Sequence, residues 1–350
     1  MAHRVPHVLH VLPHRGGGAE TYIDLLEEIE GFHHTRLALA LDRRPVPGLL
    51  SAAARYPLVL RRARAAHIVH AHGDVAALLA QPLLARQPSV WTTHGLHFLR
   101  RAEGPASQGA KRGLTRVIAA AGHTLCTSET EREELLALAG PYRGRVMTVR
   151  NGIDLPAPVQ APARAQARAQ LGLDEGELAV LFLGELEQRK RPLDAAAAAA
   201  AAGGRGAPVV LLVAGEGPQA AELRERAGPA VRVLGYRRDR DRLLAASDVL
   251  VLPSEREGLS FALLEAMGAG LAPVVSDGPG NAEAVGDAGI VFGLGDVDAL
   301  AGVLERLAAQ PLDVRRRGHA ARRLVATTLT ATGMRDAVAG AYRDVLGASA

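Results

Sequence analysis

Two glutamates, Glu257 and Glu265, stand eight positions apart in the segment of this chain with the strongest chemical signal. Residues 248–252 are a short apolar segment rich in Val and Leu, which predicts a buried strand that ends in a Pro-Ser turn just before Glu257. The apolar run that follows predicts a helix that carries Glu265 about two turns further along, on the same face. Because open α/β sheets bind ligands outside the carboxyl ends of their strands, both carboxylates are expected at a binding site.

The residues between these glutamates predict a surface that holds hydroxyl or phosphate oxygens. Gly258 lets a ligand approach the backbone closely. The first helical turn, around Leu259, Ser260 and Phe261, has N–H groups without partners inside the helix, and these groups can hold such oxygens. Taken alone, the spacing of the glutamates fits a solvated helix face equally well.

A loop with three basic residues follows another expected strand, at residues 178–183. It begins at Gly184 and contains Arg189, Lys190 and Arg191. Lysine supplies a compact charge and arginine a forked donor, and both suit phosphate oxygens. This loop therefore predicts a clamp for a diphosphate.

The first expected strand, residues 5–12, leads into a glycine turn and an amphipathic helix. Gly17 and Gly18 stand at this turn, where backbone N–H groups can approach a phosphate. Glu20 either faces a second substrate or simply suits the positive end of the helix dipole. The turn predicts a second phosphate-binding backbone.

Histidines recur in the first half of the chain, and the relevant ones are His70, His72, His94 and His97. A metal site is not favoured, because these residues fall on different expected strands and no carboxylate or cysteine stands at ligand spacing nearby. Neutral imidazoles that bond to hydroxyl groups explain them more simply.

These segments together resemble the retaining glycosyltransferases of family 4, which have the GT-B fold. The Glu-x7-Glu element at Glu257 carries most of the resemblance. Pro253-Ser254, Pro273-Val274-Val275 and Gly280-Asn281-Ala282-Glu283 flank it in the order of the family. Gly-Gly-x-x-Glu from Gly16, Thr-x-His-Gly up to Gly95 and Asn-Gly-Ile-Asp from Asn151 match in the first half. The resemblance covers nearly the whole chain.

The resemblance implies roles for individual residues. Glu257 contacts the donor sugar, Glu265 holds the ribose hydroxyls, and His94 lies near the donor sugar. Gly17 and Gly18 bring backbone N–H groups to the donor diphosphate. Retention of the anomeric configuration is also implied by the family, and two mechanisms stay open: Glu257 acts as nucleophile, or the leaving phosphate accepts the proton on the same face.

The basic loop departs from the family at one position. Lys190 matches the family lysine, whereas Glu185 stands where the family usually has arginine. A carboxylate repels a diphosphate, so Glu185 is expected to turn away and Arg189 or Arg191 to supply the second positive charge. The departure leaves two alternatives: a non-catalytic protein that binds sugar nucleotides, and a GT-B sugar-nucleotide epimerase.

The expected reaction is transfer of a hexose-type sugar from a nucleotide-diphosphate sugar to a hydroxyl of a glycan, a lipid-linked acceptor or a small molecule. No Asp-x-Asp motif is placed to chelate a donor-bound metal. Neither a metal ligand nor a cofactor is therefore expected, and the sugar nucleotide serves as co-substrate.

The length of 350 residues suits two domains. The expected fold class is α/β, a GT-B arrangement of two Rossmann-like, doubly wound domains that face each other across a cleft. The first domain, 1–155, takes the acceptor side and is completed by a C-terminal helix at about 332–348; the second, 165–330, binds the sugar nucleotide. A Pro- and Ala-rich segment up to residue 163 marks the boundary. Residues 58–60 are expected to form a further strand.

Charge is shared unevenly between the two halves. Residues 1–150 carry a net charge of +7 and the remainder carries −3, which gives the overall +4. The basic half suits an anionic membrane surface or a phosphate-bearing acceptor, and solvated arginine-rich faces explain it as well. Nucleic acid is not an expected partner, because no aromatic residues interleave with the basic ones. The single cysteine and the lack of a signal-peptide pattern predict a cytoplasmic protein, at most associated with the inner face of the membrane.

Overall fold

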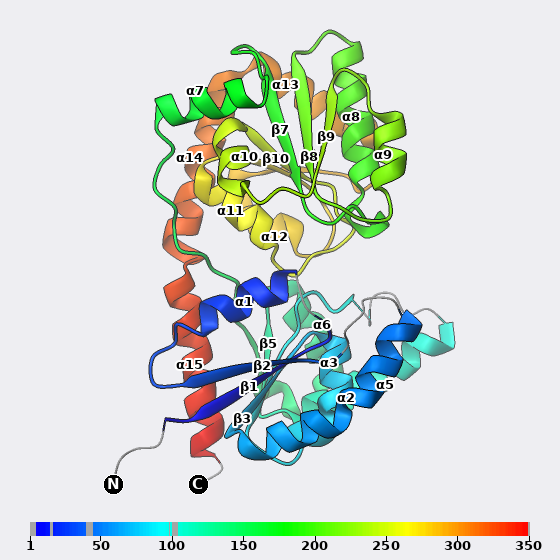
Figure 1. Cartoon of the computed structure of the whole chain (residues 1–350), viewed down its shortest axis with the longest axis vertical. Coiled ribbons are helices and arrows are strands. Elements are labelled where there is room, and N and C mark those ends of the chain that lie inside the picture. Colours follow the sequence, from blue (N-terminus) through cyan, green and yellow to red (C-terminus); the bar gives the residue numbers. More distant parts are fainter. Residues whose placement is uncertain (1–4, 15–16, 40–44, 98, 100–103, 349–350) are drawn as a thin grey trace. The chain divides into compact units, whose positions relative to one another are not determined.

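The computed structural model describes residues 5–14, 17–39, 45–97, 99 and 104–348. The chain forms two compact units (Figure 1), one made of Met1–Asn151 with Ala331–Ala350 and the other of Gly152–Thr330. Each unit is built on a six-stranded sheet in which all pairings are parallel. The expected class, two Rossmann-like α/β domains, is confirmed.

The sheet of the first unit has the order β2-β1-β3-β4-β5-β6. Its strands are β1 His7–Leu12, β2 His33–Ala38, β3 Ile68–His72, β4 Ser89–Thr92, β5 His123–Cys126 and β6 Val146–Thr148. Its helices are α1 Gly18–Leu26, α2 Pro45–Ala65, α3 Asp74–Leu84, α5 Gly104–Ala120, α6 Glu129–Ala139 and α15 Ala331–Gly347.

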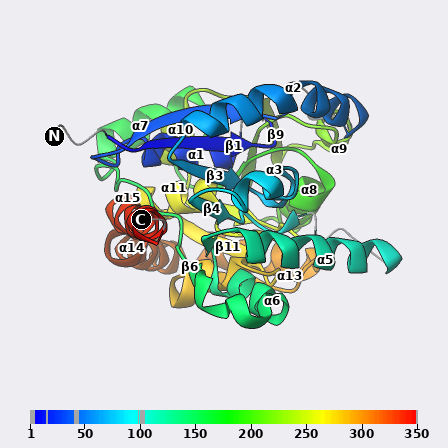
Figure 2. The ribbon, with the colours of Figure 1, turned by 90° about the horizontal axis from the view of Figure 1, so that it is seen from below.

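The two faces of this sheet bury different kinds of side chain. Leu9, Val11, Val69 and Trp91 point to one face, where they form a core with apolar residues of α2, α3 and α5, and Figure 2 shows these helices together. The other face is covered by α1 and α15. Because side chains alternate along a strand, this second face receives His10 of β1 with His70 and His72 of β3.

The sheet of the second unit has the order β12-β11-β10-β7-β8-β9. Its strands are β7 Leu178–Leu183, β8 Val209–Ala214, β9 Val231–Gly235, β10 Val249–Leu252, β11 Ala272–Ser276 and β12 Ile290–Phe292. Its helices are α7 Ala161–Gln170, α8 Pro192–Gly204, α9 Ala220–Arg226, α10 Arg240–Ala246, α11 Phe261–Ala269, α12 Asn281–Val285, α13 Val297–Ala309 and α14 Pro311–Thr328.

The core of the second unit is built from small and aliphatic residues. Alanines of α8 and leucines of α13 pack on inward-facing side chains such as Val180, Phe182 and Val251. The strand order reverses direction between β7 and β10, so the loops after these two strands diverge at their carboxyl ends. Such a topological switch point is where doubly wound sheets bind ligands.

One expected element is wrong. Residues 58–60 are not a strand but lie inside α2, Pro45–Ala65, which continues through Pro57. Val59 and Ala63 are buried four positions apart, which is helical spacing. A short apolar run does not by itself distinguish a strand from the buried face of a helix.

None of the helices in the described part of the chain is both long enough and apolar enough to cross a membrane.

Candidate active site

Lys190 and Glu257 meet at the switch point of the second unit. Lys190 belongs to the short 3-10 helix Gln188–Lys190 after β7, and Glu257 lies in the loop after β10. The Nζ atom of Lys190 lies 2.5 Å from Oε1 of Glu257. Nη1 of Arg189 lies 3.5 Å from the same oxygen. The structure therefore gathers one carboxylate and two cations from two loops that the sequence separates by 67 positions.

Backbone bonds hold these loops in register. The N–H of Glu255 donates to the carbonyl of Arg189 at 2.9 Å, and the N–H of Glu257 donates to the carbonyl of Pro279 at 3.0 Å. The second contact is close because Gly280, with φ +83°, has no side chain: a Cβ there would lie 2.3 Å from the carbonyl oxygen of Glu257. The loops after β7, β10 and β11 thus form one interlocked surface.

Glu257 is a buried carboxylate held in its charged form. Only 7% of the residue is exposed. Burial raises the pKa of Glu257, but the charges of Lys190 and Arg189, with a hydrogen bond from Lys190, outweigh burial and hold the pKa below its ordinary value. The side chain is thus an acceptor for hydrogen bonds and a stabiliser of positive charge, with an ammonium group in direct contact.

The two candidate arginines of the clamp differ in their partners. Arg189 donates to Glu187 at 2.6 Å and to the carbonyl of Arg256 at 3.1 Å, and it also faces Glu257. Arg191 adopts a left-handed backbone with φ +51°, donates to Asp194 at 2.6 Å and lies 3.7 Å from Glu255. Arg189 is therefore the arginine that the structure brings to Glu257.

Glu265 lies on α11 and has a partner that the sequence reasoning missed. Nη1 of Arg240, the first residue of α10, donates to both carboxylate oxygens of Glu265 at 2.8 and 2.9 Å. Burial raises the pKa of Glu265 above its ordinary value, and Arg240 offsets part of this increase. No sequence spacing links Glu265 to Arg240, because their contact depends on how two helices pack.

The start of α11 differs from the expectation. The helix begins at Phe261 with Ser260 as its N-cap residue, so Glu265 stands just over one turn into the helix, not two turns beyond Glu257. Gly258 and Leu259 belong to the loop and are buried. Ser260 makes no side-chain cap to the helix. Gly184 closes β7, and the neighbouring Glu185 is exposed.

In the first unit, the predicted residues lie at the carboxyl ends of strands of that unit's own sheet. Gly17, with φ +85°, is the N-cap residue of α1 after β1, and Gly18 opens the helix. His94 lies two residues after the end of β4 and has a left-handed backbone with φ +54°. Thr93 beside it donates to the buried carboxylate of Glu131 at 2.5 Å, which anchors this turn. Sequence reasoning did not identify Glu131.

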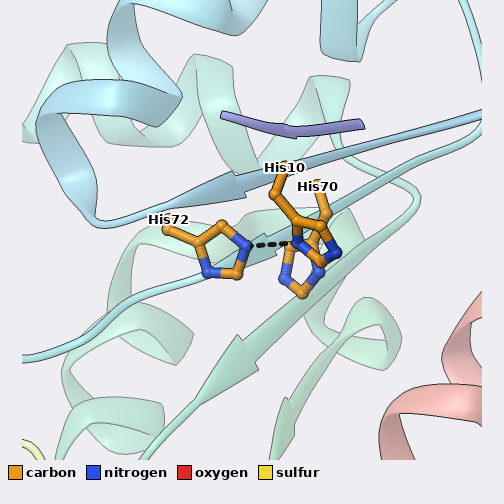
Figure 3. Close-up of side chains that lie close together, drawn as sticks. All are labelled: His10, His70 and His72. Carbon is orange, nitrogen blue, oxygen red and sulfur yellow. Dashed lines mark hydrogen bonds between the residues drawn. The ribbon is translucent and has the colours of Figure 1, made fainter. Parts of the chain in front are cut away.

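His94 is a neutral imidazole, because burial lowers its pKa to about 4. Its Nε2 lies 3.1 Å from Nδ1 of His72, and the ring edge of Tyr22 packs on it with 4.8 Å between centroids. The nitrogens of His10, His70 and His72 lie within 4.8 Å of one another (Figure 3). The argument that different strands keep His70 and His72 apart from His94 is wrong, because β3 and β4 are neighbours and His72 contacts His94. The sequence reasoning also missed His10, which β1 places opposite His70.

Comparison with known proteins gives the family. Residues 3–156 match the profile of "Glycosyltransferase Family 4", and residues 177–310 match that of "Glycosyl transferases group 1". The chain therefore belongs to these glycosyltransferases.

Two curated relatives and one solved structure illustrate the similarity. A glycogen synthase of Mycobacterium tuberculosis is 29% identical over 73% of this chain and 63% of its own length. A D-inositol 3-phosphate glycosyltransferase of Streptomyces avermitilis is 32% identical over 73% of this chain and 61% of its own. The chain thus spans less than two thirds of the length of these relatives. Anabaena HepE, solved in complex with UDP, superposes with a TM-score of 0.78 at 17% identity, over 96% of this chain and 98% of HepE. That likeness shows the fold, which is GT-B.

Proposed function

We propose that this chain is a retaining, metal-independent glycosyltransferase that moves a hexose-type sugar from a nucleotide-diphosphate sugar to a hydroxyl of an acceptor. The observation that carries the proposal is the contact between Lys190 and Glu257, at 2.5 Å, at the switch point of the second sheet. Membership of the family supports the reaction class.

The chemistry follows from the charges at this point. Cleavage of the bond between sugar and phosphate develops positive charge at the anomeric carbon and negative charge on the leaving diphosphate. Glu257, ionised and buried, suits the first charge, and Lys190 with Arg189 suits the second. These fixed cations can stabilise the negative charge on the leaving diphosphate without a divalent metal, so no metal is proposed.

The donor site extends along the second unit. The N–H groups at the start of α11, near Ser260 and Phe261, are proposed to hold phosphate or sugar oxygens. Glu265 is proposed to accept hydrogen bonds from the ribose, with Arg240 fixing its orientation. Gly17 and Gly18 are proposed to bring backbone N–H groups to the donor diphosphate, and His94 to lie near the donor sugar. HepE was solved with UDP, so a uridine nucleotide is the first donor to test.

The acceptor side is proposed to lie on the basic first unit. Exposed basic residues stand on two helices of that unit: Arg61, Arg62 and Arg64 on α2, and Lys111, Arg112 and Arg116 on α5. Such a surface suits a phosphate-bearing acceptor or an anionic cytoplasmic membrane face that carries a lipid-linked one. Pelleting with vesicles that contain phosphatidylserine, against neutral vesicles, tests this part: binding to both or to neither contradicts it.

The test starts with nucleotide binding and ends with product. UDP, GDP and ADP are each added at about 100 times the dissociation constant, with EDTA or with magnesium; a ligand at that ratio adds about 2.7 kcal/mol to the free energy of unfolding. The nucleotide that stabilises the protein in EDTA identifies the donor series. NMR of the transferred sugar then gives its anomeric configuration, and inversion would overturn the retaining assignment.

Two rival functions give different results in the same experiments. A non-catalytic sugar-nucleotide-binding protein binds the donor and releases no nucleoside diphosphate with any acceptor. A sugar-nucleotide epimerase interconverts free donors without any acceptor. Glu305→Gln is a matched control for substitutions of Glu257. Glu305 also pairs with an arginine, Arg205, at 2.7 Å, but on an exposed surface, so its substitution should leave transfer unchanged.

A further inference from the structure

Four histidines form a continuous hydrogen-bonded chain across the sheet of the first unit. Nδ1 of His34 lies 2.9 Å from Nε2 of His10, and Nδ1 of His10 lies 2.9 Å from Nε2 of His72. Nδ1 of His72 lies 3.1 Å from Nε2 of His94. The chain follows the strand order β2-β1-β3-β4, from the edge strand to the turn after β4.

The orientation of the rings is the same at every link. Each contact joins Nδ1 of one ring to Nε2 of the next, from His34 to His94. All four rings are neutral, because burial lowers each pKa, to about 4 for His34 and His94 and well below the ordinary value for His10 and His72. A neutral imidazole carries one N–H, so each ring can donate through only one nitrogen.

Only two proton arrangements satisfy all three contacts. In the first, every ring carries its proton on Nδ1, and His94 presents an N–H at the nitrogen outside the chain. In the second, every ring carries it on Nε2, and Nδ1 of His94 presents a lone pair. Any mixture of tautomers puts two protons, or none, into one of the contacts. The tautomer of His94 is therefore coupled to that of the other three rings.

A fifth histidine lies beside the chain but is not part of it. His70 is as buried as His10, yet Nδ1 of His70 contacts the hydroxyl of Tyr342 at 2.7 Å and Nε2 contacts that of Thr92 at 2.8 Å. In Figure 3 the dashed contact joins His10 and His72, and His70 lies next to them. His70 is thus a matched control for the chain.

A metal ion is a weaker explanation of this cluster. The group that is close enough to bind one, His10, His70 and His72, offers three imidazoles and no carboxylate. A divalent charge would be buried there without an anionic ligand. Nδ1 of His10 and Nε2 of His72 also contact each other at 2.9 Å, which is a hydrogen-bond distance.

We propose that His34, His10 and His72 are a proton relay behind His94, which lets Nδ1 of His94 take up a proton released in the reaction and pass it to the edge of the sheet. This role rests on the proposed function, which places His94 beside the donor sugar. The relay ends at Nε2 of His34, a buried nitrogen without a hydrogen-bond partner among the described residues, where water would have to receive the proton.

The transfer step balances with one proton. The acceptor O–H bond breaks as the new C–O bond forms, and the electron pair of the old C–O bond goes to the leaving phosphate oxygen. The acceptor proton moves to Nδ1 of His94, directly or from that phosphate. One proton then hops along each contact, and Nε2 of His34 releases one to water. This uptake starts from the arrangement with every proton on Nε2 and leaves every ring protonated on Nδ1. After the products leave, one proton enters from water at Nε2 of His34, one moves along each contact in the opposite sense, and Nδ1 of His94 releases its proton to water in the vacated site, which restores the Nε2 arrangement.

Nitrogen-15 NMR of histidine-labelled protein tests the chain without any substrate. Nitrogen shifts distinguish Nδ1–H from Nε2–H rings. We expect His34, His10, His72 and His94 to share one tautomer, or to exchange between the two together, at pH 7. His70→Phe should leave their signals in place, whereas His10→Phe should release His72 and His94 from the tautomer of His34. Opposite tautomers in neighbouring rings, or a doubly protonated ring at pH 7, would overturn the relay.

Steady-state kinetics test whether sugar transfer uses the histidine relay. We expect His10→Phe to lower kcat about tenfold or more, which is less than the roughly hundredfold or greater contribution of a general acid–base group because His94 itself remains, with the donor KM within about threefold. His34→Phe, at the half-buried edge, should act in the same direction and disturb the core less. His70→Phe should change kcat by less than about threefold. Unchanged kcat in folded His10→Phe and His34→Phe overturns the relay and leaves the proposed function intact; a wild type that transfers nothing overturns the function, while NMR still decides the chain.

Discussion

Lys190 and Glu257 form a largely buried ion pair, with 2.5 Å between Nζ and Oε1 and only 14% and 9% of the two side chains exposed. The pair joins the loops after β7 and β10, the two strands between which the sheet reverses direction. A donor diphosphate placed there would meet a cation that is already fixed by a carboxylate. The pair is therefore preorganised for a ligand with a negative and a developing positive charge.

Glu257→Ala should abolish sugar transfer while the affinity for the nucleoside diphosphate changes by no more than about tenfold, or 1.4 kcal/mol. The reason is that Glu257 is assigned to the sugar and not to the nucleotide. Isothermal titration with the nucleotide and a transfer assay measure the two effects. A fully active variant would refute the assigned role.

Lys190→Met should act on both stability and binding. It leaves the carboxylate of Glu257 buried without its closest cation, which costs about 3 kcal/mol when a buried pair loses one partner. Arg189, at 3.5 Å, compensates part of this loss. We expect a lower free energy of unfolding in urea and weaker nucleotide binding. The double variant Lys190→Met with Glu257→Gln should recover stability but not transfer, and no recovery would contradict a direct pair energy.

The ribose assignment of Glu265 predicts a change in selectivity. Glu265→Gln should bind the ribonucleoside diphosphate less tightly but the 2′-deoxy form almost as well as the wild type does, because a carboxylate accepts from both hydroxyls and an amide accepts through one oxygen only. The comparison of the two dissociation constants measures this. Arg240→Ala is the control, since it removes the partner of Glu265 and keeps the carboxylate. Equal losses of affinity for both nucleotides would show that Glu265 does not bind the ribose hydroxyls.

The fold and the separate loops were predictable from sequence, but their contacts were not. Apolar runs that end in glycine turns gave strands such as 178–183 and 68–72, because buried parallel strands are continuous apolar segments. Lys190 and Glu257 are 67 positions apart in the sequence. They meet because β7 and β10, the strands that precede them, are neighbours in the sheet. Sequence places a residue at the end of a strand and does not state which strand lies beside it.

The histidines show the same limit. His10, His34 and Arg240 carried no motif, and their importance comes from register: β1 pairs His10 with His70, and two-residue alternation puts both on the face under α15. The expectation of hydroxyl partners describes His70, which contacts Tyr342 and Thr92. It does not describe His10 or His72, which bond to other imidazoles. A pairing of strands is needed before such a network can be recognised.

Gly280→Ala should destabilise the second unit and disturb its site. The new Cβ would lie 2.3 Å from the carbonyl oxygen of Glu257, at a backbone with φ +83°. Gly270→Ala is the matched control, because Gly270 has φ +89° and nothing within 4 Å. In both variants the left-handed backbone lowers the free energy of unfolding by about 1 kcal/mol. In Gly280→Ala, overpacking should lower it by about 1–3 kcal/mol more. Equal shifts in Tm would show that the loop moves away without cost.

The buried histidines predict how stability depends on pH. Burial lowers the pKa of His94 from 6.5 to about 4 in the folded chain. Between these values the unfolded chain binds the proton and the folded chain does not, so stability rises with pH and is lost as pH falls below 6.5. For this one ring the loss at pH 5 is about 2 kcal/mol relative to pH 8.

Urea unfolding at pH 8 and pH 5 measures this difference. His94→Gln removes the titrating ring, so the free energy of unfolding of that variant should fall about 2 kcal/mol less between pH 8 and pH 5 than that of the wild type. His319→Gln is the control, because it makes the same substitution at an exposed position of α14. Burial also lowers the pKa values of His10 and His72. The free energy of unfolding of the wild type should therefore fall by more than the contribution of His94 alone. A flat profile between pH 8 and pH 5 would mean that the rings are charged, and the coupled tautomers would then be impossible.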